Sequence, residues 1–203
     1  MNRIKRFSLV MLVLSAIAMS ACKKEDDAAP AEENDEEIIT DVKLIFTNSA
    51  DKDDIVEARA QDPDGAGVQE LKILDEINLD TSKTYVLTLE VMNNLTDPGE
   101  SIGDEIEEEN DEHQLYFSFS NDAFSNPLGD GNIDDYADDV RYNDTDANGN
   151  PVGLSTTWTT SSTPLTGGTF TIRLQHQPDI KSATSEATDG DTDFELTFVL
   201  NIN

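Results

Sequence analysis

Hydrophobic and polar residues alternate along most of the chain after Asp41, and this period of two is typical of strands with one buried face. The clearest runs cover residues 42–47, 85–92, 114–119, 152–158, 170–174 and 194–202. Weaker runs cover residues 55–60, 70–74 and 140–142. Because turns rich in Asp, Gly and Asn separate them, the pattern predicts an all-β fold. We expect an antiparallel β-sandwich, or a flattened barrel, of about seven to nine short strands with acidic loops.

Helical periodicity is confined to one short stretch. Residues 104–111 are almost wholly acidic and predict a helix of two turns at most. The chain has no internal repeat with a period of 20 to 50 residues, so an array of repeats is not expected. Residues 38–203 are therefore expected to form a single β-sandwich domain.

The first 21 residues have the pattern of a secretory signal. Basic residues precede a short apolar segment, residues 7–18, which is too short to span a membrane comfortably. Small residues before Cys22, the single cysteine, resemble the lipobox of bacterial lipoproteins. This resemblance implies cleavage before Cys22, lipidation of that residue and attachment to the outer membrane. The alternative is an ordinary signal peptide with an incidental cysteine.

Residues 22–37 predict a disordered acidic tether. No large apolar residue occurs between Cys22 and Ile38, so the segment cannot bury enough surface to fold. Its charged run, residues 23–27, resembles the surface-export signal of Bacteroidota lipoproteins and implies a domain exposed at the cell surface. A plain spacer facing the periplasm is the alternative.

The charge balance excludes several partners. Asp and Glu number 43 against 13 Lys and Arg, a net charge of -30. Binding to nucleic acid or to anionic lipid through protein charge needs a basic surface, so neither is expected. A single cysteine excludes an intramolecular disulfide and a multi-cysteine zinc site. The chain also lacks a Gly-x-Ser-x-Gly turn and a phosphate-binding Gly loop, and we expect no enzymatic activity.

Three acidic segments, residues 97–112, 130–146 and 186–193, separate the strands. The second contains Asp144, Asp146 and Asn148, which have the oxygen spacing of the first half of a calcium loop. Ser155 stands where the bidentate Glu of an EF-hand belongs, so an EF-hand is rejected. A hairpin with Asn148-Gly149 at its tip explains the same residues. Weak calcium binding by a pair of loops remains a second interpretation.

The only two histidines begin and end predicted strands on the core-facing side. If the later strands run as an up-and-down meander, both imidazoles lie at one end of the sandwich, among the acidic segments. Imidazole and carboxylate groups are suitable ligands for zinc or copper. The alternative is that each histidine caps its own strand through hydrogen bonds. The predicted metal ligands are His113, His176, Asp144, Asp146, Glu109, Glu112 and Asp191.

Three blocks of sequence, residues 102–114, 144–154 and 171–178, resemble a family of small Bacteroidota outer-membrane lipoproteins. Its members are often labelled hypothetical or "type 1 periplasmic binding fold", although that fold needs alternating strands and helices. The resemblance implies an accessory of a TonB-dependent receptor that captures a nutrient or a metal ion.

Three functions are compatible with these patterns. The first is a surface-exposed lipoprotein that binds a ligand, with a divalent metal as one candidate, and serves a TonB-dependent transporter. The second is a structural or adhesive sandwich stiffened by calcium. The third is a carbohydrate-binding or carbohydrate-processing module, for which only Trp158 and a few tyrosines are available to stack on sugar.

Overall fold

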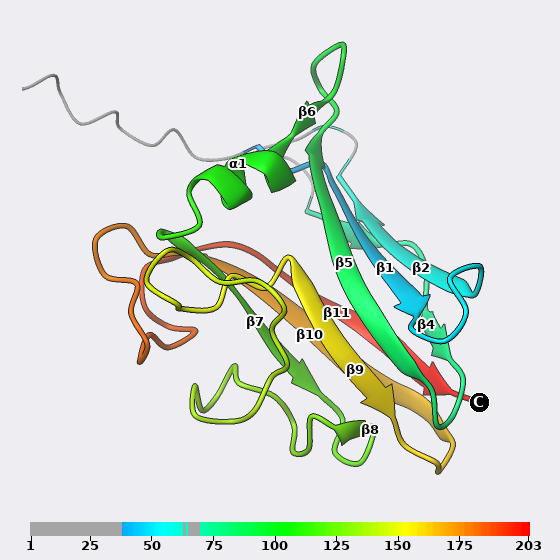
Figure 1. The fold of residues 1–203 in the computed structure, drawn as a ribbon. Helices are drawn as coiled ribbons and strands as arrows, with labels where there is room; N and C mark the ends of the chain where they lie inside the picture. The colour runs from blue at the N-terminus through cyan, green and yellow to red at the C-terminus, as the bar shows by residue number, and fades with distance from the viewer. Residues whose placement is uncertain (1–37, 63, 65–69) are drawn as a thin grey trace, which may run out of the picture. The chain divides into compact units, whose positions relative to one another are not determined.

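The computed structural model describes residues 38–62, 64 and 70–203 (Figure 1). The predicted signal sequence, the predicted tether and Cys22 lie outside these residues. The longer strands are β1 (Asp41–Asn48), β2 (Ile55–Gln61), β5 (Thr84–Asn93), β7 (His113–Phe119), β9 (Ser155–Thr160), β10 (Leu165–His176) and β11 (Asp191–Ile202). The short ones are β3 (Lys72–Ile73), β4 (Ile77–Leu79), β6 (Glu100–Ser101) and β8 (Phe124–Asn126), and the helix is α1 (Ile102–Glu108).

The strands form two sheets that pack face to face. One has the order β3-β2-β1-β5-β9-β8, with β6 also paired to β5, and the other has the order β4-β11-β10-β7. The predicted all-β sandwich is therefore confirmed. It has more strands than expected, because β4, β6 and β8 are too short to show an alternating pattern. One pair, β4 with β11, is parallel.

The core fills the space between the sheets. Its centre is Trp158 of β9, which is fully buried and donates a 2.7 Å hydrogen bond from Nε1 to Thr156 Oγ1. Rings from both sheets surround the indole with centroid distances of 4.9 to 5.4 Å, and they belong to Phe117, Phe119, Phe124 and Phe170. Edge-on aromatic contacts of this kind add to the stabilisation from burial. Trp158 is thus unavailable to stack on a sugar.

The predicted meander is wrong. Residues 140–142 form no strand, and only an isolated bridge joins Tyr142 to Thr156. Strand β9 lies beside β5 in the larger sheet, whereas β7 pairs directly with β10 in the smaller one. The chain therefore changes sheets twice between β7 and β10. Alternation shows which face of a strand is buried, but it carries no information about the neighbouring strand.

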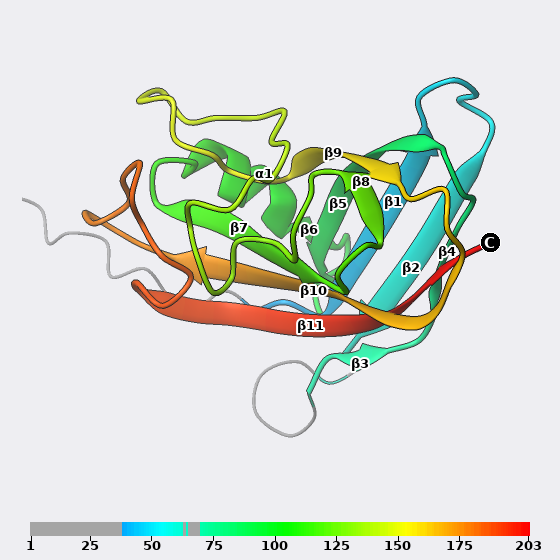
Figure 2. The same cartoon turned by 90° about the horizontal axis from the view of Figure 1, so that it is seen from below.

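The free edge of β7 is covered by loop backbone (Figure 2). The amides of Leu115 and Phe119 donate to the carbonyls of Val152 and Asp130, at 2.7 and 2.8 Å. Gly131 runs so close that a Cβ atom there would lie 2.1 Å from the Phe117 carbonyl oxygen, and its φ is +97°. Only glycine fits this position, and the loop protects an edge that would otherwise pair with another chain.

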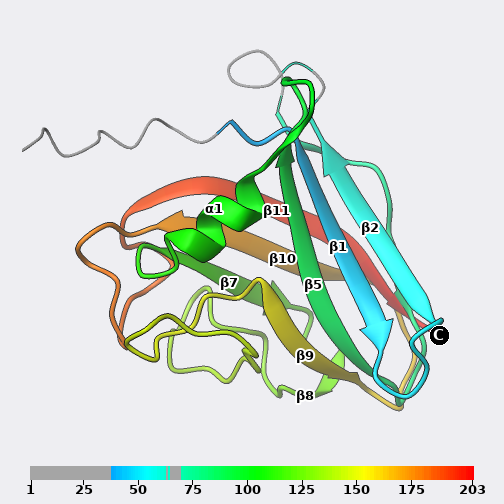
Figure 3. The ribbon, with the colours of Figure 1, turned by 45° about the horizontal axis from the view of Figure 1, so that its top comes forward.

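Helix α1 lies alongside β5 (Figure 3). It begins after Ser101, whose Oγ accepts a 3.2 Å hydrogen bond from the Asp104 amide. Ile102 and Ile106, one turn apart, are buried in the core. The cap sets the start of α1 two residues before the predicted helix, because it satisfies an amide that the helix itself leaves unpaired. In the described part of the chain, no helix is long and apolar enough to cross a membrane.

Candidate functional site

The two histidines lie directly opposite each other. His113 begins β7 and His176 ends β10, and they are partners in the antiparallel ladder. Their rings are stacked, with centroids 4.6 Å apart and planes inclined by 13°. His113 Nδ1 lies 3.2 Å from the Glu109 carbonyl oxygen, and His176 Nε2 lies 3.4 Å from Glu112 Oε2. The imidazoles thus meet through direct strand pairing rather than through a meander.

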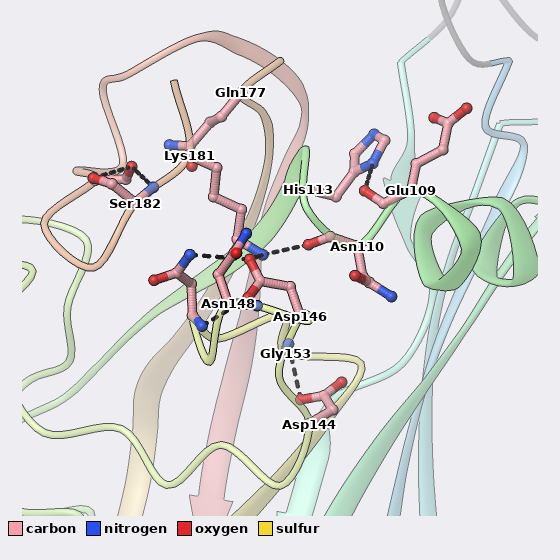
Figure 4. A network of polar contacts seen from close by, with 12 residues as sticks. Glu109, Asn110, His113, Asp144, Asp146, Asn148, Gly153, Gln177, Lys181 and Ser182 are labelled. Atoms are coloured by element: carbon pink, nitrogen blue, oxygen red, sulfur yellow. Dashed lines mark hydrogen bonds and ion pairs between the residues drawn. The ribbon is translucent and has the colours of Figure 1, made fainter. Parts of the chain in front are cut away.

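The stacked arrangement does not suit a shared metal ion. The lone pairs of imidazole nitrogens lie in the ring planes, so two nearly parallel rings cannot direct them at one point. Glu109 offers its carbonyl to His113 while its side chain points away (Figure 4). Asp191 is exposed in β11. In the described residues, the one group of three candidate ligand atoms within 4.8 Å of one another belongs instead to Asp130, Asp134 and Asp138.

The carboxylates of the predicted calcium loop are used within the loop itself. Asp146 Oδ1 accepts hydrogen bonds from the amides of Asn148 and Asn150, both at 2.8 Å. Asp144 accepts from the amides of Gly153 and Ser155, both at 3.0 Å. The Asp146 amide donates to the Asn150 carbonyl. These contacts favour the interpretation of residues 144–150 as a hairpin, in which the aspartate side chains accept hydrogen bonds from the turn's own backbone.

The cation beside this hairpin is Lys181. Its Nζ lies 3.5 Å from Asp146 Oδ2 and donates to the Asn110 carbonyl, and the side chains of both Lys181 and Asp146 are 0% exposed. Burial lowers the pKa of Lys181, and Asp146 opposes that shift. No local motif marks Lys181 in the sequence. Lys181 reaches Asp146 because the segment after β10 packs against the hairpin (Figure 4).

Three segments are therefore joined in one polar network, which we call the polar rim: the turn between α1 and β7, the hairpin 144–150 and the segment 177–190. The Gln177 amide adds a 2.6 Å hydrogen bond to the Glu112 carbonyl. The turn before β7, the hairpin 144–150 and the segment 177–190 do gather at one end, where a lysine ammonium and backbone groups hold them together. In the described residues, an ion pair and backbone hydrogen bonds thus join the segments of the polar rim.

A cleft of about 450 Å³ opens beside the rim, between β5, α1 and residues 144–155; we call it the β5–α1 cleft. It exists because β5 separates from β9: the ladder to β9 ends at Thr88, and the ladder to β6 starts at Met92. Its apolar lining is Leu89, Val91, Met92, Val152 and Leu154. Its carboxylates are Glu90, Asp104, Glu107 and Asp144. Its described lining contains no Lys, Arg or His.

The cleft carries negative charge at the surface and in its wall. Asp144 is partly buried, and burial raises the pKa of its carboxyl, opposed by the hydrogen bonds from Gly153 and Ser155. Glu90 is paired with Lys43, whereas Asp104 and Glu107 are exposed. An apolar floor with carboxylates around it suits a ligand that has an apolar body and a positive charge. Of the residues predicted for the site, Asp144 alone lines this cleft.

No family model, curated protein or solved structure matches the chain. The family resemblance in the sequence stays a prediction.

Proposed function

We propose that the protein is a lipid-anchored outer-membrane protein that captures an organic cation with an apolar body in the β5–α1 cleft and serves a TonB-dependent receptor. The observation that carries the binding part is the cleft itself, with its apolar floor and acidic lining. The lipobox around Cys22, the acidic tether and the family resemblance support the anchor, the cell-surface location and the receptor.

Size and charge both favour this ligand class. The volume of about 450 Å³ falls in the range of sites for small organic molecules. Burial of the ligand's apolar part provides affinity at roughly 25 cal/mol per Å² removed from water. The net charge of -30 attracts cations from a distance and speeds their encounter with the cleft.

The geometry of the polar rim argues against the divalent-metal ligand that the sequence suggested. The stacked imidazoles do not converge on an ion, and Lys181 already neutralises Asp146. A calcium-stiffened structural role is the alternative, and it now depends on Asp130, Asp134 and Asp138. Thermal unfolding of chelator-treated protein with added calcium tests this alternative. Selective binding of calcium to the native state raises the melting temperature, so a calcium-stiffened fold predicts an increase.

The direct test uses two fluorescent probes that share an apolar body. Dansylcadaverine carries a primary ammonium, and dansylglycine carries a carboxylate. We expect the cation to bind at least about tenfold more tightly, because the carboxylates attract one probe and repel the other. Equal binding of the two probes, or none, would refute a cation-binding cleft.

Gly103 offers a blocking variant. A Cβ atom at Gly103 would meet its nearest neighbours at 3.7 to 3.8 Å, so a side chain is accepted there and extends into the cleft. Gly103→Leu should abolish binding of dansylcadaverine and preserve folding, since leucine also favours the helix. Glu108→Leu is the matched control, because this exposed residue of α1 does not line the cleft.

The receptor part needs its own measurement. The full-length protein, purified in mild detergent from its native membrane, should co-purify with a large β-barrel. Cys22→Ser should release the protein from the membrane. Purification of the lipidated protein alone would count against a receptor partner and would leave the cleft test unaffected.

A further inference from the structure

A lysine amine, a carboxylate and a side-chain amide meet inside the polar rim. Asp146 Oδ2 lies 3.5 Å from Lys181 Nζ and accepts a 3.0 Å hydrogen bond from Asn150 Nδ2. One oxygen atom therefore contacts both nitrogens, and we call these three residues the Lys181 triad. Lys181 comes from the segment after β10, whereas the other two belong to the hairpin 144–150 (Figure 4). The described lining of the β5–α1 cleft includes none of them, so their chemistry is independent of the proposed function.

The Lys181 triad is shielded from water and held in place. The side chains of Lys181 and Asp146 are 0% exposed, and Asn150 is 8% exposed. The main-chain amide of Asn150 donates to Asp146 Oδ1 at 2.8 Å, and Lys181 Nζ also donates to the Asn110 carbonyl. An amine and an amide react slowly in water, but fixed proximity accelerates such a reaction and exclusion of water prevents competing hydrolysis.

A second set of the same three groups provides a comparison within the molecule. Asp54 Oδ2 lies 3.6 Å from Lys83 Nζ and accepts a 2.8 Å hydrogen bond from Asn48 Nδ2. There the lysine and aspartate side chains are 40% and 32% exposed. Desolvation of Lys83 is outweighed by the charge of nearby carboxylates and its pKa is raised, whereas burial lowers the pKa of Lys181. Only an unprotonated amine is a nucleophile, so the buried lysine is the one suited to react.

We infer that Lys181 and Asn150 form an intramolecular isopeptide bond, with the Asp146 carboxylate as the proton carrier. The buried ion pair is the arrangement from which the reaction starts. Asp146 Oδ2 takes a proton from Lys181 Nζ, and the lone pair of the freed amine attacks Cγ of Asn150. An Nζ–Cγ bond forms, and the π electron pair of the side-chain carbonyl moves to Oδ1.

The same carboxyl group completes the reaction. Asp146 passes its proton to Nδ2 of Asn150 and takes a second proton from Nζ. The electron pair returns from Oδ1, the Cγ–Nδ2 bond breaks, and ammonia leaves with the electrons of that bond. The products are a secondary amide, one ammonia molecule and a neutral Asp146 carboxyl group. Because buried charges are costly, the loss of both charges favours the linked state.

The bond would tie the hairpin 144–150 covalently to the segment 177–190. A cross-link between residues 150 and 181 restricts the unfolded chain in the way that a disulfide does. The single cysteine of the chain excludes an intramolecular disulfide. An isopeptide bond is therefore the covalent tie that the side chains of the polar rim can supply.

The test is a peptide map of the full-length protein, denatured and digested with trypsin. Trypsin cleaves after lysine and arginine, but not after a lysine whose amine is acylated. We expect residues 142–173 to be joined to residues 174–203, without cleavage after Lys181 and with the loss of one ammonia. Separate fragments 174–181 and 182–203 would overturn the inference. A joined fragment that has lost water instead would place the bond on an aspartate and would overturn the role of Asn150.

Variants identify the two partners of the bond. Asn150→Ala removes the electrophile and keeps the ion pair, so it should give the separate fragments. Asn148→Ala, at an exposed asparagine of the same hairpin, is the matched control and should keep the joined fragment. If Asn150→Ala fails to fold, Lys181→Arg serves in its place, because a guanidinium keeps the charge beside Asp146 and is no nucleophile. A joined fragment in Asn150→Ala or in Lys181→Arg would overturn the inference.

Two internal controls complete the experiment. Cleavage after Lys83 should be complete, because this exposed lysine keeps its proton; a bond between Lys83 and Asn48 would contradict the selection of Lys181 by burial. Gly103→Leu should leave the peptide map of residues 142–203 unchanged. Failure of the cleft and failure of the isopeptide bond are therefore distinguishable.

Discussion

The Nζ atom of Lys181 lies 3.5 Å from Oδ2 of Asp146, and both side chains are 0% exposed. This ion pair occupies the end of the sandwich where the sequence predicts a metal. The lysine ammonium also donates to Asn110, which lines the β5–α1 cleft together with Asp144 and Thr145. The ammonium of Lys181 thus links the turn that contains Asn110 to the hairpin 144–150, and both segments line the β5–α1 cleft.

Lys181→Met should destabilise the fold by about 3–5 kcal/mol, because it leaves the buried Asp146 carboxylate without a counter-charge. Urea unfolding measures the loss. Lys52→Met, at an exposed position, is the control and should change the stability by less than about 0.5 kcal/mol. The double variant with Asp146→Asn should recover part of the loss. A single variant as stable as the parent would show that the pair is open to water.

Alkaline pH should unfold the protein through its buried tyrosines. Burial raises the pKa of Tyr116 from 10.0 to about 12, and it also raises the pKa of Tyr142. A raised pKa in the folded state means a stabilising contribution that is complete below pH 10.0 and is lost as the pH rises through about 12. Absorbance at the tyrosinate band, followed with the melting temperature, measures this.

Tyr116→Phe provides the control for the alkaline experiment. It should remove part of the decline in stability above pH 10.0 while Tyr142 keeps the remainder. Complete ionisation of all four tyrosines near pH 10.0 with the fold intact would contradict the burial of these two hydroxyls.

Zinc binding should not depend on the stacked histidines. His113→Phe keeps a ring against His176 and removes both nitrogens. We expect the parent and this variant to show the same zinc-induced change in melting temperature, because the imidazole lone pairs do not converge. A shift present in the parent and absent in His113→Phe would restore the metal hypothesis.

Gly190→Ala should release the segment 177–190 from the sandwich. A Cβ atom there would lie 2.0 Å from the His176 carbonyl oxygen, and the residue has a φ of +78°. The expected destabilisation is at least about 2 kcal/mol, with faster hydrogen exchange in this segment.

Gly149→Ala is the matched control for Gly190→Ala. Its φ is +87°, but nothing lies within 4 Å of the added Cβ, so it isolates the backbone strain from the clash. It should cost only about 1 kcal/mol. Equal losses in the two variants would contradict the close approach of Gly190 to His176.

Much of the fold could be predicted because alternation is a local property. Val42, Leu44 and Phe46 are buried and face the core, as their spacing indicates, and the acidic helix lies within two residues of its predicted start. Strand β3 lies within the weaker run 70–74, whereas β4, β6 and β8 were not predicted because two or three residues carry too little pattern. Residues 140–142 showed a pattern without forming a strand, since their pairing with β9 is limited to the isolated bridge between Tyr142 and Thr156.

The candidate site was less predictable, because its parts are distant in the chain. The sequence by itself determined that the fold is a β-sandwich, that both histidines lie on core-facing positions and that Asp144–Asn148 forms an acidic turn. The tertiary structure alone decided that β7 pairs with β10, that Lys181 neutralises Asp146 and that β5 separates from β9 to open a cleft. The physical reason is that burial patterns repeat within each strand, whereas pairing depends on contacts whose free energy appears only when distant segments meet.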